Sequence, residues 1–167
     1  AIICVVSDEK KGTSSTSGMQ KTVETSTLLK ERLKIVPNRM EEIIKSIKNK
    51  NFEEFGNITM KDSNSFHSVC LDTSPPIFYL NDVSKSIIQV IEELNKSSGK
   101  IIAAYTFDAG PNAVIYTLKE NLSKVLTIIN KFFPTLDDSN SKNPFGISAN
   151  DNEIPENFNY KVIREGG

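Results

Sequence analysis

The chain has 167 residues, which fits one ordinary domain and is too short for two well-packed ones. Its 20 Lys and Arg residues against 21 Asp and Glu residues give a net charge of −1, which argues against a general nucleic-acid binder, because such a protein needs an excess of basic residues to neutralise phosphates. No apolar stretch approaches the ~20 residues that span a bilayer, no secretory signal is visible, and two Cys and one His are too few for a disulfide scaffold or a zinc cluster, so we expect a cytosolic enzyme or binding domain.

The chain starts with an apolar run, residues 2–6, that predicts a buried strand. Because Ala1 is not a methionine and the run begins at once, we expect the chain to be part of a longer protein; a trimmed terminus of a complete protein is the alternative. A polar, hydroxyl-rich segment follows, and then a helical pattern that we expect to break near Thr25 and again near Pro37.

Apolar residues spaced three and four apart predict the next two helices. The first covers residues 36–47, and the second, a short one, covers residues 52–60. Residues 72–76 end in two consecutive prolines, which cannot donate backbone hydrogen bonds, so we expect the chain to leave the helical conformation there.

The centre of the chain has clear start and stop signals. Asn81 or Asp82 can cap a helix whose apolar stripe ends at Gly99, a residue suited to a left-handed C-terminal cap. Two strands follow, at residues 101–107 and 113–118, joined by a tight connection.

The C-terminal third contains one helix, at residues 122–132, which Pro134 stops. Residues 135–157 have few core residues and many Asn, Asp and Ser, and predict a long polar surface loop. A last strand is expected near residues 158–164. This order of elements predicts an α+β domain in which helices cover an antiparallel sheet of about four strands.

Residues 14–19, Ser-Ser-Thr-Ser-Gly-Met, concentrate hydroxyl groups just ahead of a predicted helix. Hydroxyls and free N–H groups at such a position can hold a phosphate or diphosphate, and Gly18 lets an oxygen of a ligand approach the backbone. An ordinary Ser/Thr helix cap is the simpler interpretation of the spacing. Both remain open on the pattern alone.

The turn between the two central strands carries one carboxylate, Asp108, beside Gly110 and Pro111. A carboxylate on a rigid turn at a strand end is well placed for catalysis, because the scaffold fixes its geometry. The alternative is that Asp108 only accepts hydrogen bonds from the N–H groups of its turn, as Asp often does.

Other reactive residue types give weaker signals. His67 could act as an acid or base, but a lone histidine is more often structural. Cys4 lies in an apolar run and is expected to be an unreactive core thiol. The eight glycines form neither a Gly-x-Gly-x-x-Gly motif nor a Walker loop, so no nucleotide-binding loop is present in this chain.

Five strings in order resemble the C-terminal half of the diphosphomevalonate decarboxylase family: residues 5–8, 14–19, 60–67, 70–72 and 105–113. The similarity runs from residue 2 to residue 133 and is most specific at Tyr-Thr-Phe-Asp-Ala-Gly-Pro-Asn-Ala, residues 105–113. The resemblance implies the C-terminal domain fold of the superfamily of galactokinase, homoserine kinase, mevalonate kinase and phosphomevalonate kinase. It also implies ATP-dependent decarboxylation of diphosphomevalonate to isopentenyl diphosphate, in the mevalonate route to isoprenoids and sterols.

The resemblance assigns roles to individual residues of this chain. Asp108 corresponds to the catalytic carboxylate of the family, and Ser15, Thr16, Gly18 and Met19 correspond to substrate-binding positions. Some bacterial relatives have an arginine where Thr16 stands, so a guanidinium–diphosphate contact is not available at this position. The sequence of residues 135–157 is unlike the corresponding sequence in the family.

The resemblance also implies what the chain lacks. The ATP-binding loop of the family lies in an N-terminal domain that these residues do not include, so we expect ATP with Mg²⁺ to be bound mainly there and the chain alone to be inactive. The full-length protein is expected to be a cytosolic homodimer. A related kinase, such as phosphomevalonate kinase, or a non-catalytic α+β ligand-binding module with an anion site at residues 14–18, are the alternatives.

Overall fold

Three strands and five α-helices make up the part of the chain that the computed structural model describes, which is residues 1–7, 14–134 and 150–163. In chain order they are β1 (Ile2–Cys4), α1 (Ser15–Thr25), α2 (Leu28–Lys48), α3 (Phe52–Asp72), α4 (Asp82–Ser98), β2 (Ala103–Phe107), β3 (Ala113–Thr117) and α5 (Leu122–Phe132), with short 3-10 helices at Lys119–Asn121 and Asp151–Glu153. The predicted α+β class with an antiparallel sheet is confirmed.

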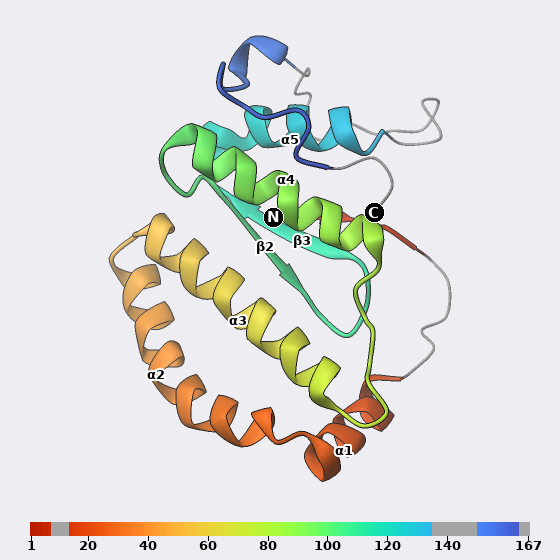
Figure 1. The fold of residues 1–167 in the computed structure, drawn as a ribbon. Coiled ribbons are helices and arrows are strands. Elements are labelled where there is room, and N and C mark those ends of the chain that lie inside the picture. The colour runs from red at the N-terminus through yellow and green to blue at the C-terminus, as the bar shows by residue number, and fades with distance from the viewer. Residues whose placement is uncertain (8–13, 135–149, 164–167) are drawn as a thin grey trace.

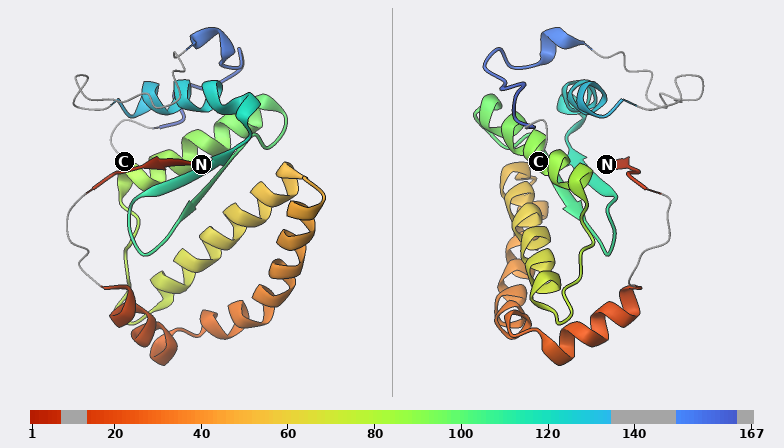
Figure 2. Two further views of the ribbon diagram at one scale, coloured as in Figure 1. Left: turned by 180° about the vertical axis from the view of Figure 1, so that it is seen from behind. Right: turned by 45° about the vertical axis from the view of Figure 1, so that its right-hand side comes forward.

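The sheet has the order β1-β3-β2, and both pairs are antiparallel. Ile115 of β3 stands between Ile2 of β1 and Tyr105 of β2. Helices α3 and α4 pack against β2, α2 lies beside α3, and α5 lies beside α4 (Figure 1). The two views of Figure 2 show β1 at the rim of the sheet and α1 below the ends of α2 and α3.

The main core lies between the sheet, α4 and α5. Ile87, Ile91 and Leu94 of the predicted stripe of α4 are fully buried, whereas its first member, Val83, is 42% exposed. The fully buried side chains of α4 meet buried residues of the sheet and of α5, and the whole set is Ile87, Val90, Ile91, Leu94, Tyr105, Ile115, Val125 and Ile128. The free edge of β2 is covered as well, because the Asn95 side chain accepts from the Ala103 N–H at 3.1 Å and donates to the Ala103 carbonyl at 2.8 Å. The backbone groups of Ala103 are thereby unavailable for pairing with a further strand.

The predicted ends of α4 are confirmed. Asn81 is the N-cap, and its side chain accepts from the Ser84 N–H at 2.9 Å while the Ser84 hydroxyl faces back to the Asn81 backbone, which completes a capping box. Gly99 ends the helix with φ of 68°, the left-handed conformation that glycine adopts without strain.

The predicted break at Pro37 is wrong, because Pro37 lies inside α2. The missing N–H is tolerated since α2 is held on both sides of the proline: Arg32 and Arg39 each donate to the carboxylate of Asp62 on α3. Figure 1 shows α2 curving along α3, as expected for a helix with a proline in its interior. The break near Thr25 is confirmed by the end of α1.

Helix α3 extends to Asp72, whereas the apolar pattern predicted an end at residue 60. The second half of α3 is polar in sequence, and its buried members include Ser63 and His67, which contact the sheet. Close approach of α3 to the sheet needs Gly56, because a Cβ there would lie 2.8 Å from Ile101 Cγ2 and 3.3 Å from Ala104 Cβ.

Both ends of the chain differ from expectation. β1 is an edge strand and not a buried one, since Ile3 is 68% exposed, and Val5, which follows the strand, is 63% exposed. The last strand expected near residues 158–164 is absent from residues 158–163, which are irregular and turn-like, so the sheet of the described residues has three strands, close to the expected number of about four. Of the predicted surface loop, residues 135–149 lie outside the described residues, but Ile154 at its end is buried in the core, as is Phe158.

Candidate active site

The carboxylate of Asp108 stands at the end of β2, on the turn that leads into β3. Asp108 is exposed and lines a hollow of about 310 Å³. The other lining residues come from the three strands and from the turn itself: Ile3, Thr106, Phe107, Gly110, Asn112 and Val114. The Gly110 N–H donates to the Asp108 carbonyl at 2.8 Å, which closes the turn. The carboxylate is therefore accessible to a small molecule.

Three elements outside the turn fix its position. The Phe107 N–H donates to Ser63 Oγ of α3 at 3.1 Å, and Ser84 Oγ of α4 donates to the Pro111 carbonyl at 2.7 Å. Asn112 Oδ1 accepts from the N–H groups of Val6 and Ser7, at 2.8 and 3.2 Å, and so joins the turn to the segment after β1.

The hydroxyl-rich stretch forms the first turn of α1. Ser14 is the N-cap, and its Oγ accepts from the Ser17 N–H at 3.1 Å. The capping interpretation is thus confirmed for Ser14, whereas Ser15, Thr16 and Ser17 are exposed beyond it.

An apolar cavity of about 420 Å³ lies between α1, α2 and α3 and brings three of the four predicted substrate-binding residues together. Ser15, Gly18 and Met19 line it from α1, and Ala109, which follows Asp108, lines it from the turn. Thr16 is not among its lining residues. The other lining residues are Thr22, Val23, Leu29, Arg32, Phe66, Val69, Cys70 and Tyr79. The turn therefore separates two hollows, with Asp108 in one and Ala109 in the other.

His67 is 7% exposed and lies behind the same turn, edge-on to the rings of Phe66, Tyr79 and Phe107. Burial lowers the pKa of His67, and hydrogen bonding to the Phe107 backbone and the charge of Asp108 oppose this shift without reversing it. The imidazole is consequently neutral at neutral pH. Its Nε2 atom has no hydrogen-bond partner among the described residues.

The two thiols are unreactive by environment. Burial raises the pKa of Cys4 to about 11, so the thiolate is scarce at neutral pH. Burial also raises the pKa of Cys70, against a smaller opposing effect of Arg32. Among the described residues, no group of three or more His, Cys, Asp or Glu side chains could hold a metal ion. The helices described are all too short or too polar to cross a membrane.

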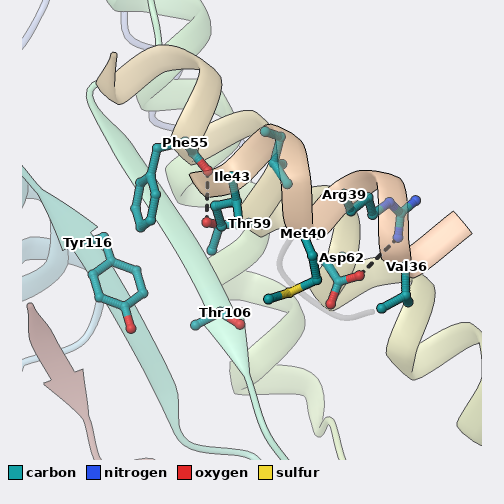
Figure 3. Close-up of a pocket in the computed structure, with 10 residues that line it drawn as sticks. Val36, Arg39, Met40, Ile43, Phe55, Thr59, Asp62, Thr106 and Tyr116 are labelled. Carbon is teal, nitrogen blue, oxygen red and sulfur yellow. Dashed lines mark hydrogen bonds and ion pairs between the residues drawn. The ribbon is translucent and has the colours of Figure 1, made fainter. Parts of the chain in front are cut away.

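A second cluster, which the sequence analysis missed, joins α2 to α3. Asp62 accepts from both terminal nitrogens of Arg32 at 2.8 Å and from Arg39 at 3.0 Å. Figure 3 shows Arg39 and Asp62 at the end of a cavity of about 260 Å³, with Phe55 and Tyr116 at its other end. The two arginines lie 30 and 23 residues from Asp62, so no local pattern links them.

Comparison with known proteins gives one consistent family. The model of the "Mevalonate 5-diphosphate decarboxylase C-terminal domain" matches residues 1–164. The diphosphomevalonate decarboxylase of Ganoderma lucidum is 52% identical over 175 residues, which cover all of this chain and 43% of that protein. The solved mevalonate diphosphate decarboxylase from Trypanosoma brucei is 31% identical, with a TM-score of 0.81 over 96% of this chain and 43% of that one.

A third relative was solved with ligands. The structure of MDDEF in complex with MVAPP, AMPPCP and magnesium is 28% identical and has a TM-score of 0.73, over 80% of this chain and 40% of that one. The chain spans less than half the length of each of these relatives.

Proposed function

Because the chain belongs to the family of mevalonate 5-diphosphate decarboxylase C-terminal domains, we propose that it is the substrate-side part of a diphosphomevalonate decarboxylase. The reaction converts diphosphomevalonate and ATP into isopentenyl diphosphate, ADP, phosphate and carbon dioxide. The observation that carries the proposal is the Asp108 turn. Asp108 is exposed, the backbone of the turn is fixed from three elements, and the next residue, Ala109, lines the cavity that is also lined by Ser15, Gly18 and Met19.

The reaction must turn a tertiary hydroxyl into a leaving group before carbon dioxide can depart. ATP supplies the phosphoryl group that does this. Asp108 orients or deprotonates the hydroxyl during that transfer, because a fixed carboxylate within reach can act as a general base. When phosphate then leaves, positive charge develops at carbon 3, and the same carboxylate stabilises it electrostatically.

The residues on α1 bind the anionic part of the substrate. The N–H groups and hydroxyls of a helix N-terminus favour negative charge, which supports assigning the diphosphate to Ser15 and Thr16, both exposed in the first turn of α1. Gly18 is buried and allows the substrate to pass close to the backbone, while Met19 contacts its apolar carbons. Thr16 lies outside the cavity and contacts the diphosphate from the rim.

The nucleotide and the remaining partners belong to the rest of the protein. Magnesium and the ATP analogue AMPPCP occur together in a similar solved structure, of which this chain covers 40%. We assign ATP with Mg²⁺ mainly to an N-terminal domain of the full-length protein, which we propose is a cytosolic homodimer.

The test is an assay of the full-length protein with diphosphomevalonate and ATP, in which ADP and carbon dioxide are measured side by side. The proposal predicts equal amounts of both, and no turnover by the 167-residue chain alone. ADP without carbon dioxide would mean a related kinase. No ADP from the full-length protein, together with measurable binding of diphosphomevalonate, would favour a non-catalytic binding module.

A further inference from the structure

Two buried serines bracket the turn that carries Asp108. Ser63 is 4% exposed and lies in the middle of α3, where its Oγ accepts from the N–H of Phe107, the residue before Asp108. Ser84 is fully buried in the first turn of α4, and its Oγ donates to the carbonyl of Pro111, three residues after Asp108. The two helices thus hold the two ends of one short turn.

These bonds satisfy backbone groups that the sheet does not use. Phe107 is opposite Ala113 in the β2–β3 ladder, and its N–H bonds to Ser63 Oγ of α3. The Pro111 carbonyl lies outside both strands, so the Ser84 hydroxyl takes the place of a strand partner. Removal of either hydroxyl leaves one end of the turn free to shift, while the hydrophobic core next to it stays intact.

We propose that Ser63 and Ser84 are positioning residues that fix the Asp108 carboxylate for the reaction, an inference that rests on the proposed function. Neither serine lines the hollow of Asp108 or the cavity beside Ala109, so neither acts by touching the substrate. Both act through the backbone of the turn. A catalytic group must be held to a fraction of an ångström, and a displacement of about 1 Å can cost ~10²-fold in rate.

The capping role of Ser84 has to be separated from its contact with the turn. Ser84 Oγ lies 3.0 Å from Asn81 Oδ1 and 2.7 Å from the Pro111 carbonyl, and one hydroxyl proton can serve only one acceptor at a time. Asn81→Ala removes the cap of α4 and leaves the Ser84–Pro111 bond in place, so it is the control for loss of the cap.

A second control matches the chemistry and burial of the two serines. Ser46 is fully buried in α2, and its Oγ donates at 2.8 Å to the carbonyl of Ile43 in the same helix. Ser46→Ala therefore removes a buried hydroxyl without touching the turn.

The experiment measures kcat and KM for diphosphomevalonate in the full-length enzyme. We expect kcat to fall ~10- to 100-fold in Ser63→Ala and Ser84→Ala, in line with a small displacement of the catalytic group, with KM within about twofold of wild type. Ser46→Ala and Asn81→Ala keep kcat within about twofold, because neither removes a bond to the turn that carries Asp108. If an alanine variant does not fold, the cysteine variant replaces it, because a thiol has similar size but bonds weakly.

The decisive readout is the double variant with Asp108→Asn. If the serines act through the carboxylate, Ser63→Ala and Ser84→Ala lower the residual turnover of Asp108→Asn by less than about twofold, because residues that act as a unit are not additive. Serine variants with the kcat of the Ser46 control, or with undiminished effects in the Asp108→Asn background, would overturn the inference alone. A wild-type enzyme that releases no carbon dioxide would overturn the proposed function and the inference together.

Discussion

The ion-pair cluster between α2 and α3 makes a sharp prediction for Asp62→Asn. The carboxylate accepts three charged hydrogen bonds, two from Arg32 and one from Arg39, whereas the amide offers one oxygen and turns a donor toward the guanidinium groups. We expect the variant to leave one arginine without its partner and to weaken the packing of α2 on α3.

The magnitude follows from the exposure of the cluster. A buried hydrogen bond to a charged group contributes ~1.5–3 kcal/mol, and an exposed ion pair contributes ~0.2–1 kcal/mol. The Asp62 side chain is 40% exposed and those of Arg32 and Arg39 are 15% and 21% exposed, so the pairs lie between these limits but are screened by solvent. The loss of free energy of unfolding is then about 2 kcal/mol in total, or about 4–8 °C in Tm for a domain of this size.

The effect also has a defined pH dependence. Burial alone would raise the pKa of Asp62, but the hydrogen bonds and charges of Arg32 and Arg39 outweigh it and hold the pKa below its ordinary value. A lowered pKa means that the carboxylate stabilises the fold above its unfolded-state pKa of ~3.9 and that this contribution is lost as the pH falls through the folded-state pKa. The difference between wild type and Asp62→Asn is therefore largest near neutral pH and shrinks below about pH 4.

Urea unfolding of the wild-type chain and the variant, at neutral and at acidic pH, measures both quantities. Glu24→Gln is the matched control, because Glu24 pairs with Lys21 on the surface of α1 and both side chains are more than half exposed. We expect that control to change the free energy of unfolding by less than about 0.5 kcal/mol. An Asp62→Asn chain as stable as wild type at neutral pH, or a difference that does not depend on pH, would refute the reasoning.

Three further predictions concern the core, the thiols and the substrate. Ile154→Ala is expected to lower the free energy of unfolding by about 2–4 kcal/mol, because Ile154 is 7% exposed in the main core, while Ile47→Ala, at a site 59% exposed, changes it by under about 1 kcal/mol; equal effects in urea unfolding would contradict the packing of Ile154. Cys4 and Cys70 should react slowly with iodoacetamide near pH 8 in the folded protein and rapidly in urea, because burial raises both pKa values; fast alkylation of the folded protein would contradict this. In the full-length enzyme, Thr16→Ala should raise KM for diphosphomevalonate more than it lowers kcat, because it removes a contact made equally in the ground and transition states, and steady-state kinetics decides this.

Apolar spacing and capping residues predicted helices and strands correctly where tertiary packing favours the same structure. The apolar stripe and the caps of α4 predicted the helix almost to the residue, because Asn81 and Gly99 have no competing role. The two central strands and α5 were predicted for similar reasons. Elsewhere, contacts between distant residues outweigh local preference. Proline usually ends a helix, but the bonds from Arg32 and Arg39 to Asp62 hold α2 together on both sides of Pro37.

The polar half of α3 shows why the residues that hold the Asp108 turn could not be predicted from the sequence. Ser63 is polar, so the spacing of apolar residues predicts that it lies at the surface. It is buried instead, and its hydroxyl bonds to the backbone of Phe107, 44 residues away. From its position in the sequence, Ser84 is indistinguishable from an ordinary helix-capping residue. No nearby residue indicates its bond to Pro111, 27 residues away. The catalytic role of Asp108 stays a prediction that rests on the resemblance of residues 105–113 to the family, whereas Ser63 and Ser84, which hold its turn, come from two other elements.

The most direct test of the account is the rate of carbon dioxide release from diphosphomevalonate by the full-length enzyme with Asp108→Asn. Asn keeps the size of the side chain and much of its hydrogen bonding in the turn, but removes the charge. We predict that kcat falls by at least ~10³, as expected for the loss of a general base and charge stabiliser, while KM changes little and the protein melts near the wild-type temperature. A variant that releases carbon dioxide at the wild-type rate would show that Asp108 only shapes the turn, and would contradict the catalytic role on which the account depends.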